Sequence, residues 1–119
     1  AYSRERRVNI MRRSDLKTSK VLPIRHNPAL FKRVLVDEPV SCLRHLSQAI
    51  FKPGDTAFTH SHDDAFEVFY CVKGECVFRV KGEEVLLRKG SCLVVEPLEA
   101  HSIEKVSKIT EVLFMLVER

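Results

Sequence analysis

Two histidines and a glutamate lie close together in the sequence, between two glycines. The three residues are His60, His62 and Glu67, and the glycines are Gly54 and Gly74. His60 and His62 are two positions apart, so on a β-strand their side chains would leave the same face. Glu67 follows a short polar turn and begins a run of β-branched and aromatic residues that is typical of a strand. Two imidazoles and a carboxylate that converge on one point can hold a first-row transition metal.

The spacing of these residues resembles a known motif. From Gly54 to Gly74 the pattern is glycine, five residues, histidine, one residue, histidine, four residues, glutamate, six residues and glycine. This pattern matches, without a gap, the first motif of the cupin superfamily. The resemblance covers about residues 34–118. It implies an all-β fold, a small double-stranded β-helix or jelly-roll barrel with a metal inside.

The second cupin motif is matched in part. Gly90 and His101 have the separation that this motif requires, so the resemblance supplies a fourth ligand position. Pro97 lies one residue later than the motif places it, Leu98 replaces a glycine, and Lys105 stands where the motif has asparagine. These departures concern the shape of the loop before His101 and leave the histidine in place. The metal ligands that the resemblance implies are His60, His62, Glu67 and His101.

The implied ligand set predicts the kind of chemistry. Three neutral imidazoles and one carboxylate leave a divalent ion with a net positive charge and free coordination positions. We expect one Fe, Mn, Ni, Co or Zn ion, because no thiolate belongs to the set. The resemblance implies oxygenase, isomerase or lyase chemistry on a small polar substrate, an organic acid or a sugar derivative. The alternative is a non-catalytic cupin module that binds a sugar or another small molecule. Beyond the ligands no acid–base pair stands out, so the sequence assigns no catalytic residue.

Short strands separated by glycine and proline are expected to position these residues. Strand-like segments recur about every ten residues, and none has a convincing helical period. Pro23 limits the first of them to the edge of a sheet. The pattern predicts an antiparallel sandwich or barrel, with a further short strand as a candidate around residues 7–10. The expected strands are residues 21–24, 31–36, 41–51, 56–62, 66–72, 76–80, 85–88, 91–95, 101–106 and 110–118.

The composition is that of one globular domain. The chain has 119 residues, of which 45% are hydrophobic and 30% charged, as in ordinary soluble proteins. No apolar run approaches the roughly 20 residues of a membrane helix, and no secretory signal is evident. The four cysteines lie in apolar runs, which favours buried thiols over disulfides. We therefore expect a cytoplasmic protein.

Positive charge is concentrated near the N-terminus. Residues 1–33 hold ten of the 20 Lys and Arg but two acids, a net charge of +8, whereas residues 34–119 have a net charge of −4. We expect a basic N-terminal arm with an edge strand in residues 1–33 and a cupin barrel in residues 34–119. The arm lacks interleaved aromatic residues, so a solvated or subunit-docking role is favoured over nucleic-acid binding. The resemblance and the continuously apolar residues 112–117 predict a homodimer.

Other polar side chains near the motif have two interpretations each. His26 and His45 could contact a substrate, although a lone histidine on an early strand or turn is more often a satisfied or exposed side chain. Arg44 and Gln48 share one face of their expected strand, and His45 and Ser47 share the other. One of these pairs is expected to line the cavity. An inward Arg44 would indicate an anionic substrate.

Overall fold

Ten β-strands make up the regular structure of the described chain. The structure, a computed structural model, describes residues 11–119, and within this range no helix forms. The described residues accordingly include no helix of the length and hydrophobicity needed to cross a membrane. The strands are β1 (Lys20–Ile24), β2 (Asn27–Val36), β3 (Leu43–Phe51), β4 (Ala57–His60), β5 (Ala65–Lys73), β6 (Glu75–Val80), β7 (Glu83–Arg88), β8 (Cys92–Val95), β9 (His101–Val106) and β10 (Thr110–Glu118).

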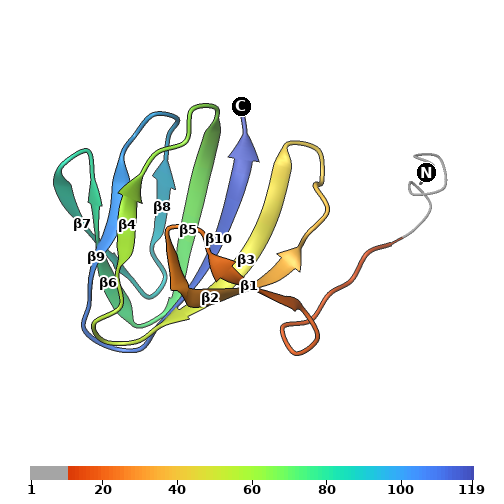
Figure 1. The fold of residues 1–119 in the computed structure, drawn as a ribbon, viewed down its shortest axis with the longest axis horizontal. Helices are drawn as coiled ribbons and strands as arrows, with labels where there is room; N and C mark the ends of the chain where they lie inside the picture. The colour runs from red at the N-terminus through yellow and green to blue at the C-terminus, as the bar shows by residue number, and fades with distance from the viewer. Residues whose placement is uncertain (1–10) are drawn as a thin grey trace.

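The strands form two sheets that pack against each other (Figure 1). The larger sheet has the order β1-β2-β3-β10-β5-β8, and the smaller has the order β4-β9-β6-β7. The paired strands are antiparallel throughout both sheets. Strand β10 lies near the centre of the larger sheet, between β3 and β5. This all-β, two-sheet architecture confirms the predicted jelly-roll fold.

The core fills the space between the sheets, because alternate side chains of each strand point inward. On β5, Phe69 and Cys71 are buried whereas Tyr70 is exposed. The Phe69 ring lies 4.8 Å from the ring of Phe78 in the smaller sheet and 6.1 Å from Phe114 on β10, measured between centroids. These three rings therefore tie the two sheets together, and Phe69 lies on the strand that also carries Glu67.

The predicted strands are present, with differences at their ends. Strands β9 and β10 have the predicted bounds, and β1 lies at the edge of the larger sheet, as Pro23 predicts. Strand β2 begins at Asn27, earlier than expected, because the turn at residues 25–26 is shorter than predicted. It continues unbroken through residues 33 and 34, where the sequence divides the arm from the barrel. That division stays a prediction, and the candidate strand around residues 7–10 lies outside the described residues.

The expectation of four buried thiols is wrong for two of them. Cys71 and Cys76 are buried, whereas Cys42 and Cys92 are exposed, and all four are free. Cys92 begins β8, where Val95 is buried and Leu93 packs against the core. Because strand residues alternate between faces, this pattern turns Cys92 outward.

The turn between β5 and β6 packs tightly against the start of β10. Gly74 in this turn has a φ angle of +80°, and a Cβ atom placed there would lie 2.2 Å from the carbonyl oxygen of Ile109. The neighbouring Thr110 is fully buried, and its hydroxyl oxygen accepts a hydrogen bond of 3.1 Å from the Glu75 N–H. Only glycine fits this position without moving the backbone. The contact fixes one end of β5, the strand that carries Glu67.

Replacement of Gly74 tests this contact. We expect Gly74→Ala to lower the free energy of unfolding by about 2–4 kcal/mol, because a clash with backbone adds to the strain of a positive φ angle. Gly82→Ala is the matched control, since Gly82 has a φ angle of +82° but no atom near the added Cβ. It should cost only about 1 kcal/mol. Urea denaturation measures both values, and equal losses would contradict the packing argument.

Candidate metal centre

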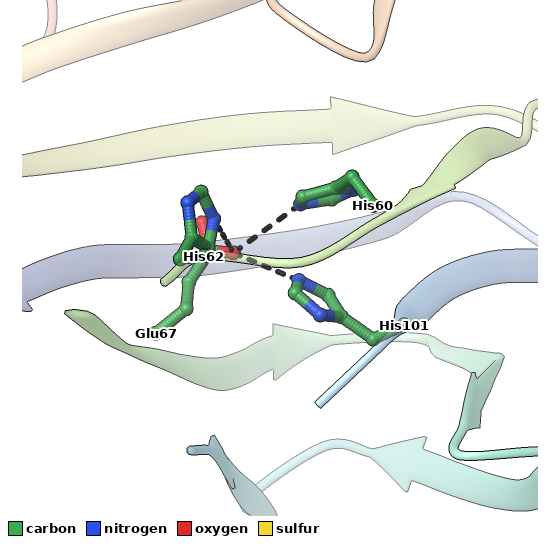
Figure 2. A group of neighbouring side chains, drawn as sticks. All are labelled: His60, His62, Glu67 and His101. Atoms are coloured by element: carbon green, nitrogen blue, oxygen red, sulfur yellow. Dashed lines mark hydrogen bonds and ion pairs between the residues drawn. The ribbon is translucent and has the colours of Figure 1, made fainter. Parts of the chain in front are cut away.

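The four predicted ligands come from both sheets. His60 ends β4 and pairs with His101, which begins β9 of the smaller sheet. Glu67 lies on β5 of the larger sheet, and its carboxylate points toward the histidines (Figure 2). His62 lies beyond β4, in the segment that crosses to β5. The fold thus brings together Glu67 and His101, which are 34 positions apart in the sequence.

The predicted strand over residues 56–62, which would have carried both His60 and His62, is longer than the observed strand β4. Strand β4 ends at His60, so the two histidines do not use the alternation of one strand to face the site. Their rings lie 5.2 Å apart between centroids, at an angle of 81°. His62 reaches the site from a loop, and its convergence with His60 depends on the path of that loop.

The loop before His101 helps to set this path. The Leu98 N–H donates a hydrogen bond of 2.7 Å to the carbonyl oxygen of His62. Leu98 has a φ angle of +71°, in the left-handed region, and its side chain is largely exposed. Glycine favours this backbone conformation, which agrees with the glycine that the cupin motif has at this position. The loop therefore forms its hydrogen bond to His62 although Leu98, not glycine, occupies the left-handed position.

Three imidazole nitrogens converge on one carboxylate oxygen. The Nε2 atoms of His101, His62 and His60 lie 3.0, 3.2 and 3.6 Å from Oε1 of Glu67. One donor atom from each of the four residues lies within 4.8 Å of the other three. Donor atoms bound to a single ion are about 3 Å apart, since metal–ligand bonds are about 2.0–2.2 Å long. The four side chains therefore have the spacing of a metal site.

Backbone carbonyls determine which nitrogen of two histidines carries a proton. Nδ1 of His60 lies 3.0 Å from the carbonyl oxygen of Phe58, and Nδ1 of His101 lies 2.9 Å from that of Glu99. A carbonyl oxygen only accepts hydrogen bonds, so each Nδ1 donates, and the neutral rings present their Nε2 lone pairs to Glu67. Lone pairs that face a carboxylate oxygen require a cation between them, either a proton that makes the ring an imidazolium donating to Glu67 or a metal ion. A divalent metal ion fits this requirement.

The pKa shifts of these side chains also indicate that the cluster requires a positive charge. Burial opposes ionisation of Glu67, but hydrogen bonds with the three histidines outweigh it and hold the pKa of this carboxyl well below its usual range. Burial also disfavours the charged form of His101, yet its bonds to Glu67 and to the Glu99 carbonyl raise its pKa above 6.5. The cluster therefore retains an anionic carboxylate and attracts positive charge, which a metal ion would supply in place of a proton.

A fifth histidine packs against the cluster. The ring of His26, from the turn between β1 and β2, stacks on His60 with 3.4 Å between centroids and 12° between planes. Burial and the nearby His60 and His62 lower the pKa of His26 to about 4, so this ring is neutral at pH 7. Its carbonyl oxygen accepts a hydrogen bond of 3.1 Å from the Phe58 N–H. His26 thus contacts a predicted ligand, the less common of the two interpretations that the sequence allows.

A cavity of about 380 Å³ adjoins the four side chains. This volume is near the lower end of the range of small-molecule sites, about 300–1,000 Å³. Much of its wall is apolar and includes the rings of Phe69 on β5 and Phe114 on β10. Besides the four predicted ligands, the polar residues that line it are Arg25, His26, Lys32, Arg44, His45 and Ser102.

The alternation of β3 resolves which of its side chains face the cavity. His45 lines it, and the buried Ser47 on the same face has its hydroxyl oxygen 3.1 Å from Nδ1 of His45. Gln48 lies on the other face and is not part of the wall. Arg44, although on that other face, reaches the cavity near the beginning of β3, where it pairs with Glu118 at 3.2 Å. The inward face of β3 is therefore that of His45 and Ser47, but the cavity wall takes one residue from each pair, His45 and Arg44.

Lys32 also lines the cavity, and the sequence had not identified it as a cavity residue. It lies on β2 between Leu30 and Val34 on the same face, both of which turn toward the interior. Alternation within the strand predicts an inward lysine at this position. Its place among the many basic residues of the N-terminal segment instead suggested a solvated side chain.

Comparison with known protein sequences identifies a family and a related protein. Residues 47–117 match the sequence model described as Cupin domain. The oxalate-binding protein of Thermotoga maritima is 34% identical over 65 residues, which are 55% of this chain and 53% of that protein. The match therefore spans about half the length of this curated relative.

Solved structures with the same fold agree along most of the chain. A protein of Thermotoga maritima described as a predicted oxalate decarboxylase has a TM-score of 0.75 at 22% identity, covering 92% of this chain and 100% of its own. An RmlC-like cupin of Shewanella frigidimarina has a TM-score of 0.75 at 19% identity, covering 92% and 93%. At these identities the similarity concerns the fold alone. Because the Cupin domain model covers more than half of the sequence and the fold agrees, this chain belongs to the cupin family.

Proposed function

We propose that the protein binds one divalent transition metal and uses it to bind a small organic acid. The observation that carries this proposal is the convergence of three Nε2 atoms on one oxygen of Glu67. Three nitrogens and one oxygen suit Fe, Mn, Co, Ni or Zn. When bound, the ion would act as a Lewis acid toward a ligand oxygen. The residues that would hold it are His60, His62, Glu67 and His101.

The cavity supports an anionic ligand of small size. Three cationic side chains line it, whereas among the described lining residues the only carboxylate is that of Glu67, which is a proposed metal ligand. A metal ion would make the interior more positive still. The apolar walls would exclude water from a bound molecule and strengthen its electrostatic interactions. The name of the Thermotoga relative, an oxalate-binding protein, supports the same ligand class.

Two kinds of activity are compatible with such a site. Oxygenase, isomerase or lyase chemistry would use the metal together with His26, His45 or Lys32, which are the other titratable groups close to the ligands or in the cavity wall. A sugar derivative is the second substrate class. The alternative is binding without catalysis, and the relative named as a binding protein favours that alternative.

Metal content tests the proposed centre. Wild-type protein purified without a metal-affinity tag is expected to carry about one ion per chain, and His60→Ala and Glu67→Ala less than about a tenth of that, because each loses a ligand. His45→Ala is the matched control, since it removes a cavity histidine that is not a proposed ligand. Elemental mass spectrometry gives the values. Metal retained by Glu67→Ala, or a wild type that takes up no added ion, would contradict the proposal.

Metal affinity should also depend on pH. The metal requires a neutral His101, and the bonds of this residue to Glu67 and to the Glu99 carbonyl raise its pKa in the ion-free cluster, so protons compete with the metal for Nε2 as the pH falls. We expect the dissociation constant to rise at least about tenfold as the pH falls from about 8 to about 6. Competition with a chromogenic chelator measures it. An affinity that is constant over this range would argue against imidazole ligation.

We also propose a homodimer formed through the outer face of the larger sheet. On β10, Leu113 and Met115 point away from the core and are half-buried, and the paired Tyr70 on β5 is exposed. The expected mass in light scattering at micromolar concentration is twice 13.7 kDa. Leu113→Lys should reduce it to one chain mass, whereas Leu86→Lys, on the smaller sheet, should leave it unchanged. A monomeric wild type would refute the dimer.

A further inference from the structure

Lys32 places a positive charge in the wall of the cavity. The residue projects from the inner face of β2, and its Nζ atom lies 5.8 Å from the centroid of the Phe114 ring. Its neighbours Phe31 and Arg33 are exposed on the outer face. The long side chain thus extends over an aromatic surface inside the barrel instead of into solvent.

The charge of Lys32 has no protein counter-ion in the described chain. No carboxylate of residues 11–119 is within ion-pairing distance of its Nζ atom, whereas Arg44 has Glu118. Burial lowers the pKa of Lys32, the charge of Glu67 opposes this shift, and Arg25 adds to it. A partly buried ammonium that no nearby carboxylate neutralises is costly. An anion bound beside Lys32 would remove this cost and favour its charged form.

A second polar group lies against the same ring. His45 is 5.8 Å from Phe114 between centroids, at 84°, and its Nδ1 is held 3.1 Å from the Ser47 hydroxyl oxygen. Phe114 in turn stacks against Phe69, which lies edge-on to the metal-site residue His101. The cavity therefore has two polar regions, the histidine–glutamate cluster and the pair Lys32 and His45, with aromatic rings between them.

We propose that Lys32 binds the second carboxylate of a small dicarboxylic acid whose other end is held at the metal centre. This assignment rests on the proposed metal-dependent binding function and names its ligand class. The ammonium group would form a charge-assisted hydrogen bond with the carboxylate, and His45 would lie beside it as a further polar contact. The aromatic rings would pack against the short carbon chain between the two ends. Monocarboxylic acids would use the metal alone.

Calorimetric titration of the metal-loaded full chain tests the assignment. Lactate, malate and 2-hydroxyglutarate share a metal-chelating 2-hydroxycarboxylate end, and the last two add a second carboxylate at two lengths. We expect wild type to bind at least one of the diacids about tenfold more tightly than lactate. In Lys32→Met, which keeps the side-chain length and removes the charge, this ratio should fall to about one. Lys32→Gln is a second variant that retains a polar end.

The control variant is Lys105→Met, which removes an exposed lysine of β9 that does not line the cavity. It should keep the wild-type preference. A preference that survives in both Lys32 variants, or a wild type that does not distinguish the diacids from lactate, would overturn the assignment. Metal content of the same samples separates the two proposals. Bound metal and lactate binding without a diacid preference would refute the role of Lys32 alone, whereas protein that takes up no metal would refute both.

Discussion

Imidazole lone pairs and a carboxylate oxygen cannot face one another at about 3 Å without a cation among them. In this protein the Nδ1 protons of His60 and His101 are committed to backbone carbonyl oxygens, so their Nε2 atoms face Glu67 as acceptors. The burial of Glu67 and His101 strengthens this constraint, because little solvent is present to screen it. The site therefore requires positive charge at its centre. This charge would also make the electrostatic potential of the adjoining cavity more positive.

The barrel meets this constraint by bringing both sheets to one point. The pairing of β4 with β9 places His60 beside His101, and β5 brings Glu67 from the opposite sheet. The Phe69, Phe78 and Phe114 rings hold the two sheets at a fixed separation. A small change in this packing would move the carboxylate relative to the histidines. The core and the proposed metal site are thus one structural unit.

Much of the fold and the ligand set was predictable from local sequence. Strand periodicity and turn residues predicted where the strands lie along the chain, and the spacing of His60, His62 and Glu67 indicated a shared site. The stacking of His26 on His60 depends on how the β1–β2 turn docks on β4, which local patterns do not encode. The inward direction of Lys32 was present in strand alternation but was outweighed by the charge of its neighbourhood. The exposure of Cys92 follows from strand alternation, because Leu93 and Val95 of β8 face the core.

The most direct test of the account is a crystal structure of the metal-loaded protein with anomalous diffraction measured at the absorption edge of the bound element. We expect one anomalous peak about 2.0–2.2 Å from Nε2 of His60, His62 and His101 and from an oxygen of Glu67. We also expect Nδ1 of His60 and of His101 to keep their carbonyl partners. A peak elsewhere, or a centre in which these nitrogens remain bonded to Glu67 with no ion between them, would contradict it.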